Sequence, residues 1–406
     1  MNKCLICNAS IEPFMFFGRM PIANGFLSPA QISDEYFFEL MVAFCPDCGM
    51  VQLVEQVPPE KMFHDNYAFF SSTSAGMAIH FKELAALIMR GYLKSSDPFV
   101  VEIGSNDGIT LQHFANAGIR HLGIEPSLNV AQVAMDKGIQ TVCRFFDEGV
   151  AEEILADHGQ ADVFLGTNVM CHIPNLSSVF AGIKILLKPT GVLIFEDPYL
   201  GEIVEKTSFD QIYDEHVFYF SLKSISHLAG QHGLEVVDVI PQGVHGGSMR
   251  YEVAHKGART VSAMVARQIA KEETLGLHKP ETYRRLRHNI ERSRDDLMGL
   301  LHDLRQQGRR VVGYGATSKS TTVTNYCEIT PDLVEFISDT TPIKQKKFSP
   351  GTHIPVRPYE EFVANYPDYA LLFAWNHAAE IMAKEQDFRQ AGGQWLVYVP
   401  RVEVLK

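Results

Sequence analysis

The sequence predicts an α/β protein with two parallel-sheet units behind a small cysteine-rich module. In the middle of the chain, short apolar runs at 99–104, 121–126, 161–167 and 191–197 alternate with helix-length segments. This alternation is typical of a parallel sheet with helices on both faces. A similar order returns near the C-terminus, and two C-x-x-C pairs lie near the N-terminus. We therefore expect three parts, at residues 1–64, 65–253 and 254–406.

The composition indicates an ordinary soluble globular protein. The 406 residues are 46% hydrophobic and 21% charged, and the formal net charge is -12. An acidic chain argues against nucleic acid as the main partner, because phosphate binding requires clustered Lys and Arg. No apolar run reaches the roughly 18 residues of a membrane span, and the N-terminus lacks a signal-peptide segment. We expect a cytoplasmic protein, a monomer or weak oligomer, with no membrane partner.

The N-terminal module has the cysteine pattern of a structural zinc site. Four of the seven cysteines form two C-x-x-C pairs, Cys4 with Cys7 and Cys45 with Cys48. Each pair can hold one side of a tetrahedral ion. The alternative is a redox dithiol, which needs only one pair. Four thiolates fill the coordination sphere of zinc, so the expected role of the ion is structural.

The run RMPIANGFL (19–27) lies between the cysteine pairs, and Pro21 and Gly25 mark irregular backbone in it. Arg19, Asn24 and Phe26 could hold a phosphate, a base edge and a ring of a substrate. A loop that merely packs around the metal is the alternative.

In the middle part, polar side chains follow each predicted strand. Residues 105–107, Glu125, Asn168 and the pair 196–197 come directly after the four apolar runs. In parallel sheets, ligands bind beyond the carboxyl ends of the strands. We therefore expect a binding site at this edge.

The first of these turns predicts the cofactor. Glu102, Gly104 and Gly108 form E-x-G-x-x-x-G, and glycines let the backbone approach a ligand at the head of the next helix. A dinucleotide site prefers a glycine where this chain has Asn106, which would crowd a pyrophosphate. Glu125, after the next strand, can hold both ribose hydroxyls. The set favours S-adenosylmethionine over NAD, and a purely structural turn is the alternative.

The C-terminal part follows a charged, helix-prone stretch at about 255–306. RRVVGYGATSKSTT (309–322) indicates strand, glycine turn and helix, and three more strand-like runs follow it. Ser318 replaces the last glycine of a dinucleotide turn, and no P-loop is present in the sequence. We interpret the turn as suited to phosphate, with Lys319 as the counter-charge.

FDQIYDEHVFYF (209–220) combines too many ionisable groups for a core strand with too many aromatic residues for a surface loop. Tyr67, His172, Tyr213, Glu215 and His216 together could deprotonate a carbon beside a carbonyl. Histidine supplies a base of near-neutral pKa, and tyrosine and histidine can donate to the enolate oxygen. Glu215 and His216 would point to opposite faces of a regular strand, so joint action requires a turn. A structural polar cluster is the alternative.

These motifs, in order, resemble a known family. The two cysteine pairs enclosing RMPIANGF, EIGSNDG, EDPYLGEIVEKTSFDQIYDEHVFYFS and then VHGGSMRY, VVGYGATSKS and LLFAWNHAAEIMAKEQ are similar to the sugar C-methyltransferases of the tetronitrose and mycarose type. The resemblance covers essentially the whole chain. It implies a zinc-binding domain, a central Rossmann-like S-adenosylmethionine-dependent methyltransferase domain and a second, C-terminal Rossmann-like domain.

The resemblance also implies a reaction. The substrate would be a nucleotide-linked, dTDP-type 4-keto-2,6-dideoxysugar that is methylated at C-3 through an enolate. His216 would be the base, and Tyr213, Glu215, His172 and Tyr67 would line the sugar site.

Two other functions stay open at this point. A zinc-containing NAD(P)-dependent dehydrogenase would also combine a metal with two α/β units. A zinc-ribbon module for nucleic acid or a protein partner would need a basic face, which the acidic composition disfavours.

Overall fold

The middle part of the chain folds around a seven-stranded sheet. The computed structural model describes residues 2–63, 70–73 and 75–405. The strand order is β11-β12-β9-β8-β5-β6-β7. The strands are β5 (Phe99–Ile103), β6 (Arg120–Ile124), β7 (Thr141–Val142), β8 (Ala161–Thr167), β9 (Leu187–Pro198), β11 (Leu234–Gln242) and β12 (Ser248–His255). The strands β5 to β9 are parallel, as predicted, whereas β11 and β12 form an antiparallel hairpin against β9.

Helices cover both faces of this sheet, as the sequence predicts. They are α2 (Ala75–Gly91), α3 (Leu111–Asn116), α4 (Leu128–Asp136), α5 (Glu148–His158), α6 (Leu176–Leu186), α7 (Leu200–Lys206) and α8 (Leu222–Gln231). Neighbouring residues of β5 face opposite ways, because side chains alternate along a strand. Val100 packs with residues of α2 and α3, and Val101 packs with residues of α5, α6 and α8.

The N-terminal module is an antiparallel sheet that takes its last strand from the middle part. Its order is β1-β2-β3-β4-β10. The strands are β1 (Asn2–Lys3), β2 (Ser10–Pro21), β3 (Phe37–Phe44), β4 (Val51–Leu53) and β10 (Phe218–Tyr219), with the short helices η1 (Pro29–Asp34), α1 (Pro59–Met62) and η2 (Ser71–Thr73). The module and the middle part therefore share backbone hydrogen bonds between β4 and β10.

The C-terminal part contains a second, mostly parallel sheet of order β15-β14-β13-β16-β17-β18. Only β18, at the edge, runs antiparallel to its neighbour among the described strands of this sheet. The strands are β13 (Val311–Tyr314), β14 (Ile337–Asp339), β15 (Val356–Pro358), β16 (Tyr369–Leu372), β17 (Gln394–Val397) and β18 (Glu403–Leu405). The helices are α9 (Ala263–Leu275), α10 (Pro280–Gln306), α11 (Ser318–Tyr326), α12 (Tyr359–Ala364), α13 (Ala378–Lys384) and α14 (Gln386–Gln390). The predicted second α/β unit is thus confirmed.

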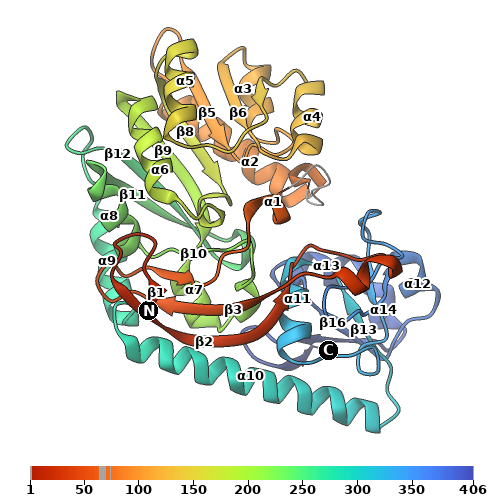
Figure 1. Ribbon diagram of the computed structural model, residues 1–406. Coiled ribbons are helices and arrows are strands. Elements are labelled where there is room, and N and C mark those ends of the chain that lie inside the picture. The colour runs from red at the N-terminus through yellow and green to blue at the C-terminus, as the bar shows by residue number, and fades with distance from the viewer. Residues whose placement is uncertain (1, 64–69, 74, 406) are drawn as a thin grey trace.

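One apolar core joins the N-terminal module to the C-terminal part. Figure 1 shows β2 and β3 reaching from the middle part toward the C-terminal unit, with the long helix α10 running beneath them. The ring of Tyr283, on α10, lies 4.4 Å from that of Phe44 and 5.0 Å from that of Phe14. Phe17 of β2 similarly contacts Tyr326 of α11, at 5.0 Å between ring centroids. The three predicted parts therefore pack as one body, and their boundaries at 64 and 253 stay a prediction.

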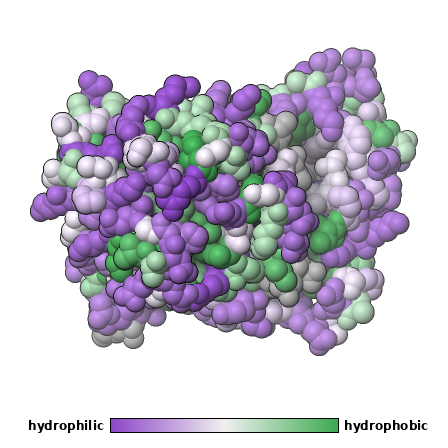
Figure 2. Space-filling model, turned by 90° about the horizontal axis from the view of Figure 1, so that it is seen from above, coloured by the Kyte–Doolittle hydropathy of each residue, from purple (hydrophilic) through white to green (hydrophobic). Residues whose placement is uncertain are grey.

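Seen from above, the surface carries hydrophobic residues interspersed among hydrophilic ones (Figure 2). Among the described helices, none combines the length and the apolar character that crossing a membrane requires.

Candidate active site

A single cavity of about 380 Å³ is lined by residues of all three parts of the chain. Eleven of the residues predicted from the sequence line it: Asn24, Glu102, Gly104, Asn106, Glu125, Asn168, His172, Tyr213, Glu215, His216 and Lys319. Tyr67 lies outside the described residues. The carboxyl edges of both parallel sheets therefore open into the same space, with the loop 211–217 between them.

The turn after β5 forms the acidic end of the cavity. Gly104 has φ +60°, and a Cβ there would lie 2.5 Å from Val169 Cγ2, so only glycine fits. Asn106 also has a positive φ, of 49°. Its backbone N–H donates to Glu125 Oε2 at 3.0 Å, and the N–H of Ser127 donates to Oε1 at 2.9 Å. These two bonds fix the Glu125 carboxylate at the cavity wall.

The polar groups at this end fit an S-adenosylmethionine site. Glu102 Oε2 and Asn168 Oδ1 are buried and have no hydrogen-bond partner among the described residues, and both residues line the cavity. Burial raises the pKa of Glu102 to about 8, although the neighbouring hydroxyl groups of Thr110 and Thr167 oppose the shift. Unsatisfied buried acceptors are costly, and a ligand that carries an ammonium group and hydroxyls can satisfy them.

Gly108 has a different role from the one expected. It does not line the cavity, and a Cβ at its position, where φ is +78°, would collide with Ile139. This glycine therefore permits close packing of the turn, and we leave it out of the set that would contact the cofactor.

The loop 211–217 makes the turn that joint action of Glu215 and His216 requires. The short helix η4 (Phe209–Gln211) precedes it, and β10 begins only at Phe218. The backbone N–H of His216 donates to Tyr213 O at 3.0 Å, and the N–H of Val217 donates to Glu215 O at 3.2 Å. Both side chains line the cavity, which an extended strand would not allow.

The hydrogen bonds of His216 define its tautomer. Nδ1 lies 2.8 Å from the carbonyl oxygen of Gln211, which can only accept, so Nδ1 carries the hydrogen. Burial lowers the pKa of His216 well below 6.5, and electrostatic interactions with the His172 ring and with Lys319 act in the same direction. The ring is therefore neutral, and Nε2 accepts a hydrogen bond from the Tyr213 hydroxyl at 2.8 Å. A lone pair on Nε2 is what a general base needs.

His172 stacks beside this base. Its ring centroid lies 5.2 Å from that of His216 and 5.8 Å from that of Phe63. Burial lowers the pKa of His172 to about 4, and its Nε2 is buried with no partner among the described residues. His172 is therefore a neutral imidazole with an open polar atom.

The C-terminal part supplies cations to the cavity. Lys319, at the start of α11, has Nζ 3.2 Å from Asn376 Oδ1 and 4.9 Å from the centre of the Trp375 ring. Lys344 donates to the carbonyl of Ala316 at 2.8 Å and lies 5.1 Å above the ring of Phe26. Burial lowers the pKa of both lysines, and carboxylates oppose the shift, chiefly Asp210 for Lys319 and Asp339 for Lys344.

Two residues expected at the substrate do not line the cavity. Arg19 lies on β2, where its guanidinium sits 5.3 Å above the ring of Phe37. Phe26 is buried, and Lys344, which does line the cavity, lies 5.1 Å above its ring. We therefore leave Arg19 out of the substrate site and give Phe26 a supporting place.

Sequence reasoning missed several residues of this cavity, namely His245, Lys344, Asn376 and His377. Burial lowers the pKa of His245 to about 3, and this residue holds φ at 52°. Asn376 and His377 end one of the three strand-like runs of the C-terminal part, whereas His245 and Lys344 lie in segments noted only for the family resemblance. A histidine before two glycines was the one local signal available for His245.

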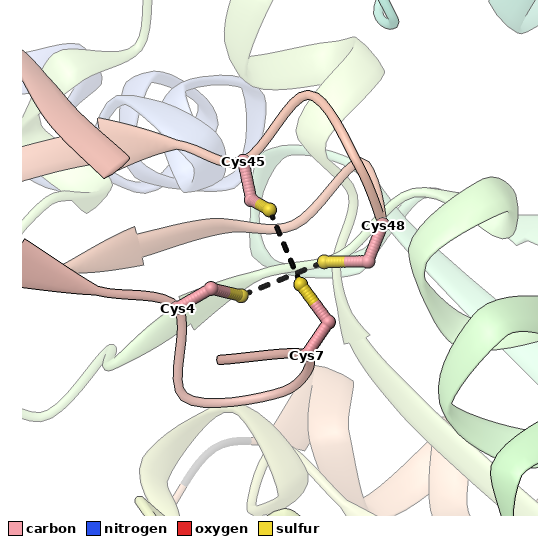
Figure 3. A group of neighbouring side chains, drawn as sticks. All are labelled: Cys4, Cys7, Cys45 and Cys48. Atoms are coloured by element: carbon pink, nitrogen blue, oxygen red, sulfur yellow. Dashed lines mark hydrogen bonds between the residues drawn. The ribbon is translucent and has the colours of Figure 1, made fainter. Parts of the chain in front are cut away.

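The four cysteines form a separate site at the far end of the module. Figure 3 shows their sulfurs pointing toward one another from two loops. Cys4 Sγ lies 3.5 Å from Cys48 Sγ, Cys7 Sγ lies 3.4 Å from Cys45 Sγ, and all four lie within 4.8 Å of one another. Zinc–sulfur bonds of about 2.3 Å in a tetrahedron separate sulfurs by about 3.8 Å, so the four thiols fit a structural zinc ion.

Comparisons with known proteins agree with this architecture. Residues 4–63 match the family described as "Putative zinc binding domain", 78–239 match "Methyltransferase domain" and 243–400 match "C-methyltransferase C-terminal domain". The chain is 36% identical over 408 residues to C-methyltransferase NovU of Streptomyces niveus, covering 100% of this chain and 97% of that protein.

Solved structures resemble only part of the chain. A methyltransferase from Anabaena variabilis is 16% identical with a TM-score of 0.35, covering 43% of this chain and 84% of its own. Magnesium protoporphyrin IX methyltransferase from Synechocystis PCC 6803 is 18% identical with a TM-score of 0.34, covering 45% and 84%. Both scores are too low to carry a conclusion.

The full-length relative decides between the functions left open by the sequence. A dehydrogenase and a zinc-ribbon binding module are both overturned by a match that spans the whole chain and all three domains. The chain belongs to the S-adenosylmethionine-dependent C-methyltransferases that combine an N-terminal zinc-binding domain, a central methyltransferase domain and a C-terminal domain.

Proposed function

We propose that this enzyme methylates C-3 of a nucleotide-linked 4-keto-2,6-dideoxysugar, with dTDP as the expected nucleotide, in the cytoplasm. The observation that supports the proposal most is the set of groups that line one cavity. Acids come from the turns after β5 and β6, neutral imidazoles come from His172 and the loop 211–217, and lysines come from the C-terminal part. A cationic cofactor, an enolisable sugar and a diphosphate need these three kinds of environment.

At the acidic end, Glu125, Glu102, Asn106 and Asn168 would bind the cofactor. Glu125 is oriented by two backbone N–H groups and would accept from the ribose hydroxyls. Bound S-adenosylmethionine supplies an electrophilic methyl group on a sulfonium. At the opposite end, Lys319 and Lys344 would hold the phosphates of the substrate.

His216 would remove the C-3 proton. Its Nε2 carries the lone pair, and its Nδ1 donates to the Gln211 carbonyl, a bond that strengthens when the ring becomes positively charged. Tyr213 donates to Nε2 in the absence of substrate. When the sugar binds, its hydroxyl would turn to the C-4 oxygen, which frees Nε2 for the proton and stabilises the enolate.

The remaining sugar-site residues would fix this geometry. His172 would donate to or accept from the sugar with its open Nε2, and Glu215 and Tyr67 would line the same pocket. The C-3–H bond would break with its proton passing to His216, and the Tyr213 hydroxyl would hold the charge on the C-4 oxygen. The C-3 carbon could then take the methyl group that bound S-adenosylmethionine would supply, while the C-4 ketone re-forms, with S-adenosylhomocysteine and one proton as the other products.

A direct test is a mass-spectrometric assay with labelled S-adenosylmethionine and a panel of nucleotide-activated sugars. We expect a labelled methyl group only on 4-keto sugars with hydrogen at C-3, because a hydroxyl at C-4 cannot stabilise the carbanion. The matched control is the same sugar reduced at C-4. Equal methylation of the ketone and its reduced form would overturn the enolate route.

A further inference from the structure

The loop 22–25 of the N-terminal module directly contacts the loop 211–217, which carries Tyr213, Glu215 and His216 and is called the catalytic loop below. It forms a tight turn, closed by the N–H of Gly25 donating to the carbonyl of Ile22 at 3.0 Å. At its tip, Asn24 Nδ2 donates to Glu215 Oε1 at 2.6 Å, across 191 residues of sequence. Both side chains line the cavity.

A second bond beside the first ties the same two loops. The backbone N–H of Ala23 donates to Asp214 Oδ1 at 2.9 Å, and Asp214 is 1% exposed. Two adjacent carboxyl groups of the catalytic loop are therefore held by two consecutive residues of the module. Burial and then the charge of Glu215 raise the pKa of Asp214 well above its usual value.

Helix α11 of the C-terminal part contacts both the loop 22–25 and the residue that precedes Tyr213 in the catalytic loop. Thr321 Oγ1 donates to the carbonyl of Ala23 at 2.8 Å, and Thr322 Oγ1 donates to the carbonyl of Ile212 at 2.7 Å. After His216, the chain enters β10, which pairs with β4 of the module. The catalytic loop is thus held at both ends by other parts of the chain, and Asn24 is the only side chain of loop 22–25 among the described residues that lines the cavity.

We propose that Asn24 is a positioning residue for the catalytic loop, rather than the substrate ligand that the sequence suggested. Its amide holds the Glu215 carboxylate at the cavity wall, and the loop held in this way keeps Nε2 of His216 directed into the cavity. The N-terminal module is then a working part of the active site. This inference rests on the proposed function, which makes His216 the base.

Four variants test the contact. Asn24→Ala removes the donor, Asn24→Asp replaces it by a second acid, Glu215→Gln removes the charge, and the double variant N24D/E215Q allows the same bond with donor and acceptor exchanged. The control is Gln31→Ala, which removes the two hydrogen bonds that Ser28 donates to Gln31 Oε1 in the same module without touching the cavity.

We expect Asn24→Ala to lower kcat about tenfold or more, since a hydrogen bond to a charged group is lost. The dissociation constant of S-adenosylmethionine should stay within about twofold, because the cofactor end is not touched. Asn24→Asp places a carboxyl group beside Glu215, next to Asp214 and among groups that include Cys171 and Lys344, both of which feel the charge of Glu215. Its activity should fall further as pH rises and the new acid ionises. In the double variant, the melting temperature should exceed that of Asn24→Asp.

NMR of ¹⁵N-labelled histidine gives a readout that needs no substrate. We expect His216 in the natural protein and in Gln31→Ala to show the Nδ1–H tautomer, and Asn24→Ala to shift or broaden its signals. If His216 signals and kcat in Asn24→Ala equal those of the natural protein, the inference is wrong. If no ketosugar is methylated, the proposed function fails, and the histidine spectra and the melting temperatures still decide the role of Asn24.

Discussion

The carboxyl edges of the two parallel sheets use the same backbone device but present side chains of opposite charge to the cavity. After β5, Glu125 accepts from the N–H groups of Asn106 and Ser127. After β13, Asp339 accepts from the N–H groups of Ala316 and Thr341, at 2.7 Å each. Glu125 directly follows β6 and Asp339 is the last residue of β14. Each holds a turn that begins with a glycine of positive φ, Gly104 in one and Gly315 in the other.

The two edges differ in what reaches the cavity. Glu125 and Glu102 line it at the first edge, whereas Lys319 and Lys344 line it at the second and Asp339 does not. A sulfonium ligand suits the first environment and a phosphate suits the second. The difference teaches that the turn fixes where a ligand lies, and that the side chains beyond it decide the charge of that ligand.

The largest effect should come from the loop between the edges. His216→Asn removes the proposed base, and general bases contribute about 10²–10⁴-fold to rate. We expect methyl transfer to fall by about that factor in single-turnover experiments, with cofactor affinity at the first edge within about twofold by calorimetry. His288→Asn, an exposed position on α10, is the control. Near-normal turnover in His216→Asn would show that His216 is not the general base.

The second effect separates the two edges. Glu125→Ala should weaken S-adenosylmethionine binding by about 10–100-fold and leave the KM of the sugar nucleotide unchanged. Lys319→Met should do the reverse, because each removes a charge-assisted hydrogen bond worth about 1.5–3 kcal/mol. Isothermal titration with cofactor and steady-state kinetics with sugar nucleotide measure the two constants. If each variant weakens the binding of cofactor and of sugar nucleotide to the same degree, the cavity does not have separate ends for the two ligands.

The sequence predicted the first edge better than the second, for a physical reason. The apolar runs and the polar residues after them define strand ends locally, so the positions of Gly104, Asn106 and Glu125 followed from spacing alone. The lysine at 344 lies in a loop with no periodicity, and its place at the cavity depends on the packing of Phe26 against it from the N-terminal module.

The contacts that the N-terminal module and the C-terminal part make with the segment around the catalytic loop could not be predicted at all. Asn24 and Glu215 are 191 residues apart, and Asp210 and Trp375 are 165 apart. Local patterns carry no information on such contacts. The requirement for a turn between Glu215 and His216 was predictable, because alternation along a strand would separate them, and the structure confirms it.

The third prediction concerns pH and distinguishes the catalytic loop from both edges. The pKa of His216 lies well below 6.5, mainly because of burial. The neutral ring is the reactive form, so kcat at saturating cofactor should show no limb from the base at pH 6.5 and should decline about tenfold per pH unit only below the lowered pKa. Rates in constant-ionic-strength buffers measure this limb, and Glu102→Gln identifies any limb near pH 8 that comes from Glu102, whose pKa is about 8. A limb at or above pH 6.5 that persists in Glu102→Gln would show that a different group acts as the base.

The smallest effect should come from the contact that joins the C-terminal part to the residues just before the catalytic loop. Asp210, fully buried just before the catalytic loop, accepts from Trp375 Nε1 at 2.6 Å and from the Tyr398 hydroxyl at 2.8 Å. Tyr398→Phe removes one of these two donors, at a cost of about 1–3 kcal/mol, and should lower the melting temperature by a few degrees. Cofactor affinity at the first edge should not change.

The pH dependence of that loss follows from the carboxyl group. Burial raises the pKa of Asp210 above its usual value, with Lys319, Trp375 and Tyr398 opposing the shift. The ionised carboxylate depends on its donors more than the protonated acid does, so the difference in melting temperature between Tyr398→Phe and the natural protein should shrink as pH falls through this pKa. Tyr366→Phe, in the same domain but away from Asp210, is the control. If both variants lose equal stability at every pH, Asp210 does not tie the second edge to the catalytic loop as an anion.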